Sequence, residues 1–193
     1  CWRFYMPGWL QPVCERCVQW FSVIPSVVFG YWGLVVVIPW IAAWRSPGPS
    51  TLAGIIVLGI MLLPTVTLFL GGTLQQFPRE YWVEGAALGL SRDRIVRHIV
   101  LPHCRPAIVA GTLLALARAW GETMALIMVC GNVVQIPRSL FDPVRVLTVN
   151  IAMEMPYARD LHRAALFVNG VVLFLGATVL VALVDRWMKR RDS

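Results

Sequence analysis

The stretch Glu84–Pro102 reads EGAALGLSRDRIVRHIVLP and separates two long apolar runs. The run before it is TLAGIIVLGIMLLPTVTLFLGG (Thr51–Gly72), and the run after it is AIVAGTLLALARAWGETMALIMVCG (Ala107–Gly131). About 20 apolar residues in a helix span the hydrocarbon core of a bilayer, so each run is long enough to cross a membrane. The charged, amphipathic stretch between them is predicted to form a structured surface that a cytoplasmic partner binds.

The composition indicates an integral membrane protein. Of the 193 residues, 58% are hydrophobic and only 14% are charged, whereas soluble domains carry about 25% charged residues. A β-barrel would show short alternating segments instead of long apolar runs. The formal net charge is +7, but the basic residues cluster in loops and at the C-terminus. This pattern is typical of membrane topology signals and does not indicate nucleic-acid binding.

The hydrophobic pattern predicts an all-α, polytopic fold with about four transmembrane helices. We expect residues 1–20 to be a cytoplasmic leader and residues 21–193 to form one membrane domain. Pro25 and Pro39 are expected to break the first span and Pro64 to kink the second. The expected spans are Phe21–Trp44, Thr51–Gly72, Pro106–Cys130 and Ala164–Trp187. Short helices, without a further crossing, are expected in the loop Asn132–Arg163.

The positions of lysine and arginine predict the orientation. Basic residues are frequent in the loop Gly72–Arg105 and in the C-terminal segment after Asp185, and the leader carries Arg3 and Arg16. With four spans these three segments lie on one side of the membrane. We therefore expect that side to be cytoplasmic, the C-terminus included, and the loop 132–163 to be extracytoplasmic.

The sequence carries no pattern of a catalytic or metal site. Cys14 and Cys17 form a single CxxC without further ligands nearby, and there is no P-loop, GxSxG or HExxH motif. The three histidines, His98, His103 and His162, are dispersed. We expect no catalytic residues, no metal and no enzyme activity in this chain. Because it begins with Cys1, we also expect an N-terminal portion to be missing or encoded elsewhere.

Arg118 and Glu122 are charged residues inside the third apolar run. An arginine at the centre of a membrane helix costs about 2.5–3.5 kcal/mol on insertion scales. The i,i+4 spacing predicts that the two side chains share one helical face, within pairing reach. One interpretation is a buried ion pair that fixes helix packing. The other is a polar path in which Arg118 binds an anion, Glu122 holds Arg118 in place and Thr123 supplies a hydroxyl.

The charged loop resembles the coupling loop of ABC importer permeases, whose pattern begins with Glu-Ala-Ala and ends with Leu-Pro. Gly89, Ile99 and the pair Leu101–Pro102 match the spacing of that pattern. Glu84 lies one residue closer to Gly89 than the pattern places it, and Gly85 stands for the first alanine, followed by Ala86. The resemblance implies a type I ABC importer permease fold.

Further segments resemble the permeases of the phosphate-specific ABC importer. They are IPSVVFGYWGLVVVIP (Ile24–Pro39), RAWGETMALIMVCGN (Arg118–Asn132), SLFDP (Ser139–Pro143) and IAMEM (Ile151–Met155). The GETM sequence followed by GN is more similar to the C-type permease than to the A-type. The resemblance covers most of the chain from Phe21 onward.

The resemblance implies a bacterial inner-membrane complex that imports phosphate. Its partners are a second permease, two ATP-binding subunits and an extracytoplasmic phosphate-binding protein; ATP and Mg²⁺ bind to the ATPase subunits, and this chain binds no cofactor. Arg118, Glu122 and Thr123 would line the translocation path. A short helix around Glu84–Arg97 would enter a groove of the ATPase, burying Ala87, Leu88 and Ile95, with Arg92, Arg94 and Arg97 at the rim. The implied coupling residues are Glu84, Gly85, Ala86, Gly89, Arg92, Ile99, Leu101 and Pro102.

Three alternatives remain open at this point. The permease could carry another oxyanion, such as molybdate or sulfate. The chain could be a truncated membrane fragment or an assembly scaffold that transports nothing. The charged helix could also lie on anionic lipid, since its arginines permit that reading.

Overall fold

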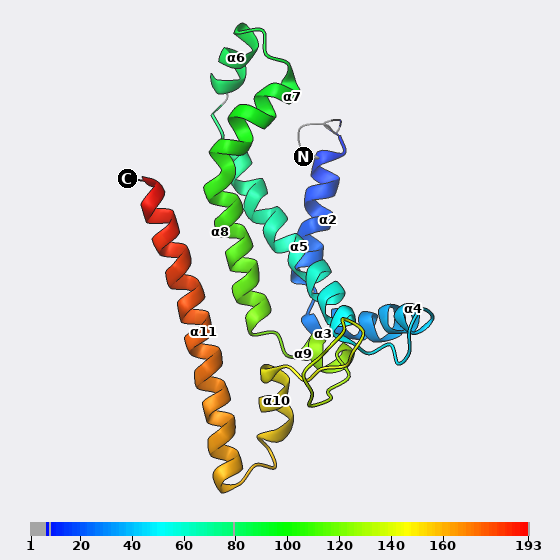
Figure 1. The fold of residues 1–193 in the computed structure, drawn as a ribbon. Helices are drawn as coiled ribbons and strands as arrows, with labels where there is room; N and C mark the ends of the chain where they lie inside the picture. Colours follow the sequence, from blue (N-terminus) through cyan, green and yellow to red (C-terminus); the bar gives the residue numbers. More distant parts are fainter. Residues whose placement is uncertain (1–6, 8, 79, 193) are drawn as a thin grey trace.

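Long helices run side by side between two ends of the molecule in the computed structural model (Figure 1). The structure describes residues 7, 9–78 and 80–192, without the side chains of residues 184 and 187–192. Three helical segments, Thr51–Gln75, Arg92–Trp120 and Asp160–Leu183, are long and apolar enough to cross a membrane, and a bent pair of helices would make a fourth. The predicted all-α fold with about four membrane helices is confirmed.

The second expected span is helix α5, Thr51–Gln75. It begins where predicted because Ser50, which is fully buried, caps it: the Ser50 hydroxyl accepts a hydrogen bond from the backbone N–H of Ala53 at 3.3 Å. The helix continues through Pro64 to Gln75. The start of α5 is hydrogen-bonded to the loop 132–163, since Thr51 donates from both its N–H and its hydroxyl to the carbonyl of Asp142, each at 3.0 Å.

The first expected span, Phe21–Trp44, is broken at Pro25 as predicted, but its first helix starts earlier, at Gln11. Helix α2 (Gln11–Val23) runs along α5 and ends before Pro25, where Ile24 is extended because the residue before a proline avoids the helical region. The chain then turns by 95°. Helices α3 (Ser26–Trp32) and α4 (Ile38–Ala42), joined by the π-helical segment η1 (Gly33–Val37), lie across the bundle (Figure 1).

Two details of that first region also differ from expectation. Helix α2 passes the boundary at residue 20, so residues 11–20 are part of the packed fold; residues 1–6 and 8 of the expected leader lie outside the described residues. Pro39 does not end the helical segment: it lies in the first turn of α4, which directly continues the π-helical segment η1.

The third expected span, Pro106–Cys130, is divided into two helices. Helix α8 (Leu101–Trp120) ends at Gly121, and α9 (Met124–Val129) follows after a short break. On the other side α8 continues helix α7 (Arg92–Ile95) through the π-helical segment η2 (Val96–Val100), forming one helical rod of 29 residues, Arg92–Trp120. The rod therefore starts well before Pro106, which lies inside α8.

The remaining helices complete the expected order. Helix α6 (Glu80–Ala87) precedes α7, and α10 (Leu147–Glu154) is the short helix of the long loop. The last helix, α11, runs from Asp160 to Asp192, beginning four residues before the predicted Ala164. It packs against α8 and α10.

Two apolar clusters hold these elements. The larger one joins α3, η1, α5 and α9; there Gly30 and Gly33 allow close packing, since a Cβ on Gly30 would lie 2.8 Å from the Ala125 Cα. Its buried members include Phe29, Val37, Ala53, Val57, Met61, Leu126 and Val129. The smaller cluster lies under the charged loop and centres on Ile95, Val100 and Cys104. This cluster packs the charged loop against neighbouring helices of the same chain.

Candidate functional site

Arg118 extends from α8 toward the middle of α5. Its guanidinium Nη1 donates to the Thr65 hydroxyl oxygen at 3.3 Å. At about 1.5 Å per residue, Thr65 lies roughly 21 Å along α5 from Thr51 and roughly 15 Å from Gln75. The arginine is therefore level with the centre of a membrane-length helix. Sequence reasoning missed Thr65, which lies directly after Pro64 in an otherwise apolar run.

Glu122 does not lie on the helix that carries Arg118. The carboxylate of Glu122 accepts a hydrogen bond from the backbone N–H of Ala125 at 3.0 Å and so caps the start of α9. Its backbone carbonyl accepts from the Thr148 hydroxyl at 2.8 Å, which ties the break to α10. The ion pairs within the described residues include none between Arg118 and Glu122. The predicted i,i+4 pairing is therefore wrong, because α8 ends between the two residues.

Thr123 lies in the same break and is half-buried. Its hydroxyl donates to the carbonyl of Gly121 at 3.3 Å. The three residues predicted for a translocation path therefore make different contacts. Arg118 contacts α5, whereas Glu122 and Thr123 form hydrogen bonds in the break between α8 and α9. Helix breaks at membrane depth are tolerated where the backbone is buried in protein or lines a polar cavity.

The charge of Arg118 has no counter-charge in the part of the chain that the structure describes. Its one described polar contact is the hydrogen bond to Thr65, and the side chain is exposed. A guanidinium presents five N–H donors in a planar fork that matches tetrahedral oxyanions. The arrangement can accept an anion without first breaking an ion pair.

At the opposite end of the rod, α6 and α7 form a helical corner. Gly89 has a φ of +73°, which L-residues other than glycine rarely adopt. The N–H of Leu90 donates to the carbonyl of Gly85 at 3.1 Å, and the N–H of Gly89 to that of Ala86 at 3.0 Å. This pair of bonds is a Schellman motif, which ends α6. The backbone conformation at this position therefore explains why the loop pattern has a glycine there.

Gly85 allows α6 and α7 to pack closely at this corner. It is buried, and a Cβ at this position would lie only 2.9 Å from Cγ1 of Ile95. The half-buried Ile99 packs on the same cluster. Where the loop pattern has alanine, this chain has the one residue small enough for α6 to contact α7 so closely.

The predicted single helix over Glu84–Arg97 is wrong, because the Gly89 turn divides it into α6 and α7. Ile95 is also unavailable to a partner's groove, since it is 3% exposed inside its own chain's cluster. Residues of α6 and of the turn after it are exposed instead: Val83 in α6 is 69% exposed, and Leu88 in the turn is 78% exposed. The other coupling candidates that are exposed are Glu84, Ala86, Ala87, Arg92, Arg94, Arg97 and Leu101, while Pro102 is half-buried.

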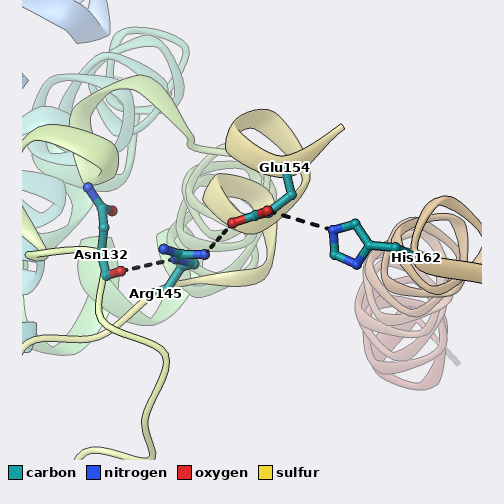
Figure 2. Close-up of polar contacts among 4 residues, drawn as sticks. All are labelled: Asn132, Arg145, Glu154 and His162. Atoms are coloured by element: carbon teal, nitrogen blue, oxygen red, sulfur yellow. Dashed lines mark hydrogen bonds and ion pairs between the residues drawn. The ribbon is translucent and has the colours of Figure 1, made fainter. Parts of the chain in front are cut away.

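A polar cluster that sequence reasoning missed lies at the other end of the bundle (Figure 2). Arg145 donates to the Glu154 carboxylate at 2.7 Å and, through Nε, to the carbonyl of Asn132 at 3.0 Å. His162 approaches the other carboxylate oxygen of Glu154 at 3.6 Å. We call these four residues the loop clamp. It connects the segment after α9 to α10 and to the start of α11.

The ends of the molecule agree with the predicted sidedness. The start of α2, the α6–α7 corner and the C-terminal end of α11 lie at one end, and α9 and α10 at the other (Figure 1). The described parts of the three basic segments therefore share one end; Arg3, Arg79 and the side chains of the C-terminal basic residues after Trp187 lie outside the described residues. Which end faces the cytoplasm stays a prediction.

Comparison with known proteins identifies the class. The family described as binding-protein-dependent transport system inner membrane component matches residues 2–192, and the chain belongs to this family. It is thus a multi-pass membrane permease component of an ABC transport system.

Several curated proteins are similar over nearly the whole chain. A probable ABC transporter permease protein, YqgH of Bacillus subtilis, is 33% identical over 96% of this chain. The phosphate transport system permease protein PstC of Xylella fastidiosa is 31% identical over 97%, and PstA 2 of Mycobacterium bovis is 32% identical over 97%. The chain spans 61%, 64% and 62% of these relatives. No solved structure matches the chain.

Proposed function

We propose that this chain is the C-type permease subunit of an ATP-driven importer that carries inorganic phosphate across the bacterial cytoplasmic membrane. Similar proteins named as phosphate transport permeases support the substrate. The observation that carries the proposal is Arg118, an arginine level with the middle of α5 whose one described polar contact is a neutral hydroxyl. A cation at that depth is costly unless an anion or water meets it, and a transported oxyanion would supply the missing negative charge.

The second part of the proposal concerns coupling to a partner ATPase. The exposed residues Val83 and Glu84 of α6 and Leu88 of the turn after it form the surface that we expect the ATP-binding subunit to contact. Gly85 packs α6 directly on Ile95 of the long rod, and the same rod carries Arg118 near its other end. A displacement of α6 would therefore move the arginine without any flexible segment between them.

The remaining partners follow from this role. Two ATP-binding subunits would bind ATP and Mg²⁺, so hydrolysis takes place outside this chain. A second permease would complete the path, and an extracytoplasmic phosphate-binding protein would deliver the anion at the end that carries α9 and α10. The C-terminal end of α11 would then be cytoplasmic.

Uptake by the reconstituted complex tests the substrate. The full permease, the second permease and the ATP-binding subunits are placed in proteoliposomes with the binding protein, and ATP-dependent uptake of radiolabelled phosphate is measured. We expect uptake that excess arsenate inhibits and molybdate or sulfate does not. Inhibition by molybdate alone would assign a different oxyanion, and a fully assembled complex without uptake of any of these anions would contradict a transport role.

A further inference from the structure

Thr65 differs in the bonding of its hydroxyl from four other threonines inside the spanning helices. Thr67, Thr73, Thr112 and Thr178 each donate their hydroxyl hydrogen to the carbonyl four residues earlier, at distances of 2.7 to 3.3 Å. This is the usual way for threonine to satisfy itself in a membrane helix. Thr65 instead appears in the described contacts only as the acceptor of the Arg118 hydrogen bond.

The chemistry of that contact leaves a donor available. A hydroxyl has one hydrogen to donate and two lone pairs to accept with. One lone pair of the Thr65 hydroxyl accepts from Arg118, and the hydroxyl hydrogen has no acceptor among the described residues. An O–H donor without an acceptor in an apolar bundle is unfavourable until a ligand supplies one.

The helices place this donor beside the guanidinium in a fixed register. Gly111 of α8 lies against Phe69 of α5, where a Cβ on Gly111 would be 3.0 Å from Cδ1 of the ring. This close contact sets the spacing of α5 and α8 about one turn from Thr65. The hydroxyl and the guanidinium therefore face the same space from two helices.

We propose that Thr65 is a phosphate-contacting residue of the translocation path, which rests on the function proposed above. Its hydroxyl accepts from Arg118 and donates to a phosphate oxygen, while the remaining guanidinium N–H groups bind other oxygens of the same anion. The ligand class is a tetrahedral oxyanion, which presents several acceptor oxygens at once. The anion is then bound between α5 and α8, so its affinity depends on the relative position of the two helices.

The test uses uptake kinetics of the complete reconstituted importer. Thr65→Val removes the hydroxyl at nearly the same volume, Thr65→Ser retains it, and Thr67→Val removes a neighbouring hydroxyl that is bound to its own helix. A hydrogen bond to a charged group changes binding by about tenfold or more. We expect Thr65→Val to raise the KM for phosphate about tenfold, and Thr65→Ser and Thr67→Val to remain within about twofold of wild type.

Each other outcome overturns the inference. If Thr65→Val behaves like Thr67→Val while Arg118→Gln abolishes uptake, phosphate transport stands and the role of Thr65 is lost. If valine and serine at position 65 impair uptake equally, the shape of the side chain matters and its hydroxyl does not. If the assembled wild-type complex takes up no phosphate, the proposed function fails, and the Thr65 role fails with it.

Discussion

The indole ring of Trp120 lies directly against Gly176 of the last helix. A Cβ at Gly176 would overlap Cζ2 of the ring, and the indole N–H donates to the carbonyl of Leu173 at 3.0 Å. Trp120 is the final residue of α8, two residues after Arg118. The end of the helix that carries the arginine is therefore fixed to α11 at a position that only glycine can occupy.

Gly176→Val should displace the indole and weaken the packing of α11. Inserting a side chain into a filled space costs about 1–3 kcal/mol. The matched control is Gly170→Val on the same helix, where a Cβ would meet nothing within 4 Å. Thermal unfolding in detergent, followed by tryptophan fluorescence, should show a lower midpoint for Gly176→Val alone. Equal midpoints for the two variants would contradict this packing.

Arg118→Gln should reduce phosphate uptake to background while the complex still assembles. Glutamine keeps a polar N–H donor on a shorter side chain and removes the positive charge that the anion would contact. Arg105→Gln serves as the control, because Arg105 is an exposed residue of the same helix. Uptake of radiolabelled phosphate is measured beside the yield of the purified complex. Near-normal transport by Arg118→Gln would remove this residue from the path.

Substitution of Gly89 should separate backbone strain from side-chain bulk at the α6–α7 corner. A Cβ there would meet nothing within 4 Å, so the cost is conformational, about 1–2 kcal/mol at a φ of +73°. Asparagine tolerates this region better than β-branched residues do. We expect Gly89→Val to lose the co-purifying ATP-binding subunit and Gly89→Asn to retain most of it. Equal retention by both variants would show that the turn is not needed for the contact.

Arg145→Met should loosen the loop clamp. The side chain of Arg145 is 19% exposed and bonds both Glu154 and the Asn132 carbonyl, so its loss leaves two acceptors without their donor. The expected destabilisation is about 1–3 kcal/mol. Arg138→Met is the control, since Arg138 is exposed and its described bond is made by its backbone N–H. Limited proteolysis should cleave the 131–160 region faster in the Arg145 variant. Identical cleavage rates in both variants would count against the clamp.

Local sequence was enough to predict most of the helices. Apolar runs of membrane length specify α5 and α11 because any bilayer-spanning segment must satisfy its own backbone hydrogen bonds. Ser50 and Gly89 mark an N-cap and a helix end by chemistry that acts within four or five residues. The loop pattern from Glu84 to Pro102 likewise identified the class of protein that the family comparison then showed.

Contacts between segments far apart in the sequence decided where the third apolar run breaks and which residue Arg118 contacts. The apolar run from Ala107 to Gly131 reads as one helix, yet the chain breaks after Trp120, where Glu122 caps α9 and Thr148 of α10 bonds its carbonyl. The arginine therefore meets Thr65, 53 residues earlier in the chain, instead of the glutamate four residues later. The sequence by itself determined that the chain forms apolar helices of membrane length and that a charged segment separates two of them. Only the tertiary structure decided the neighbour of Arg118, because helix ends and side-chain partners depend on hydrogen bonds between elements far apart in the chain.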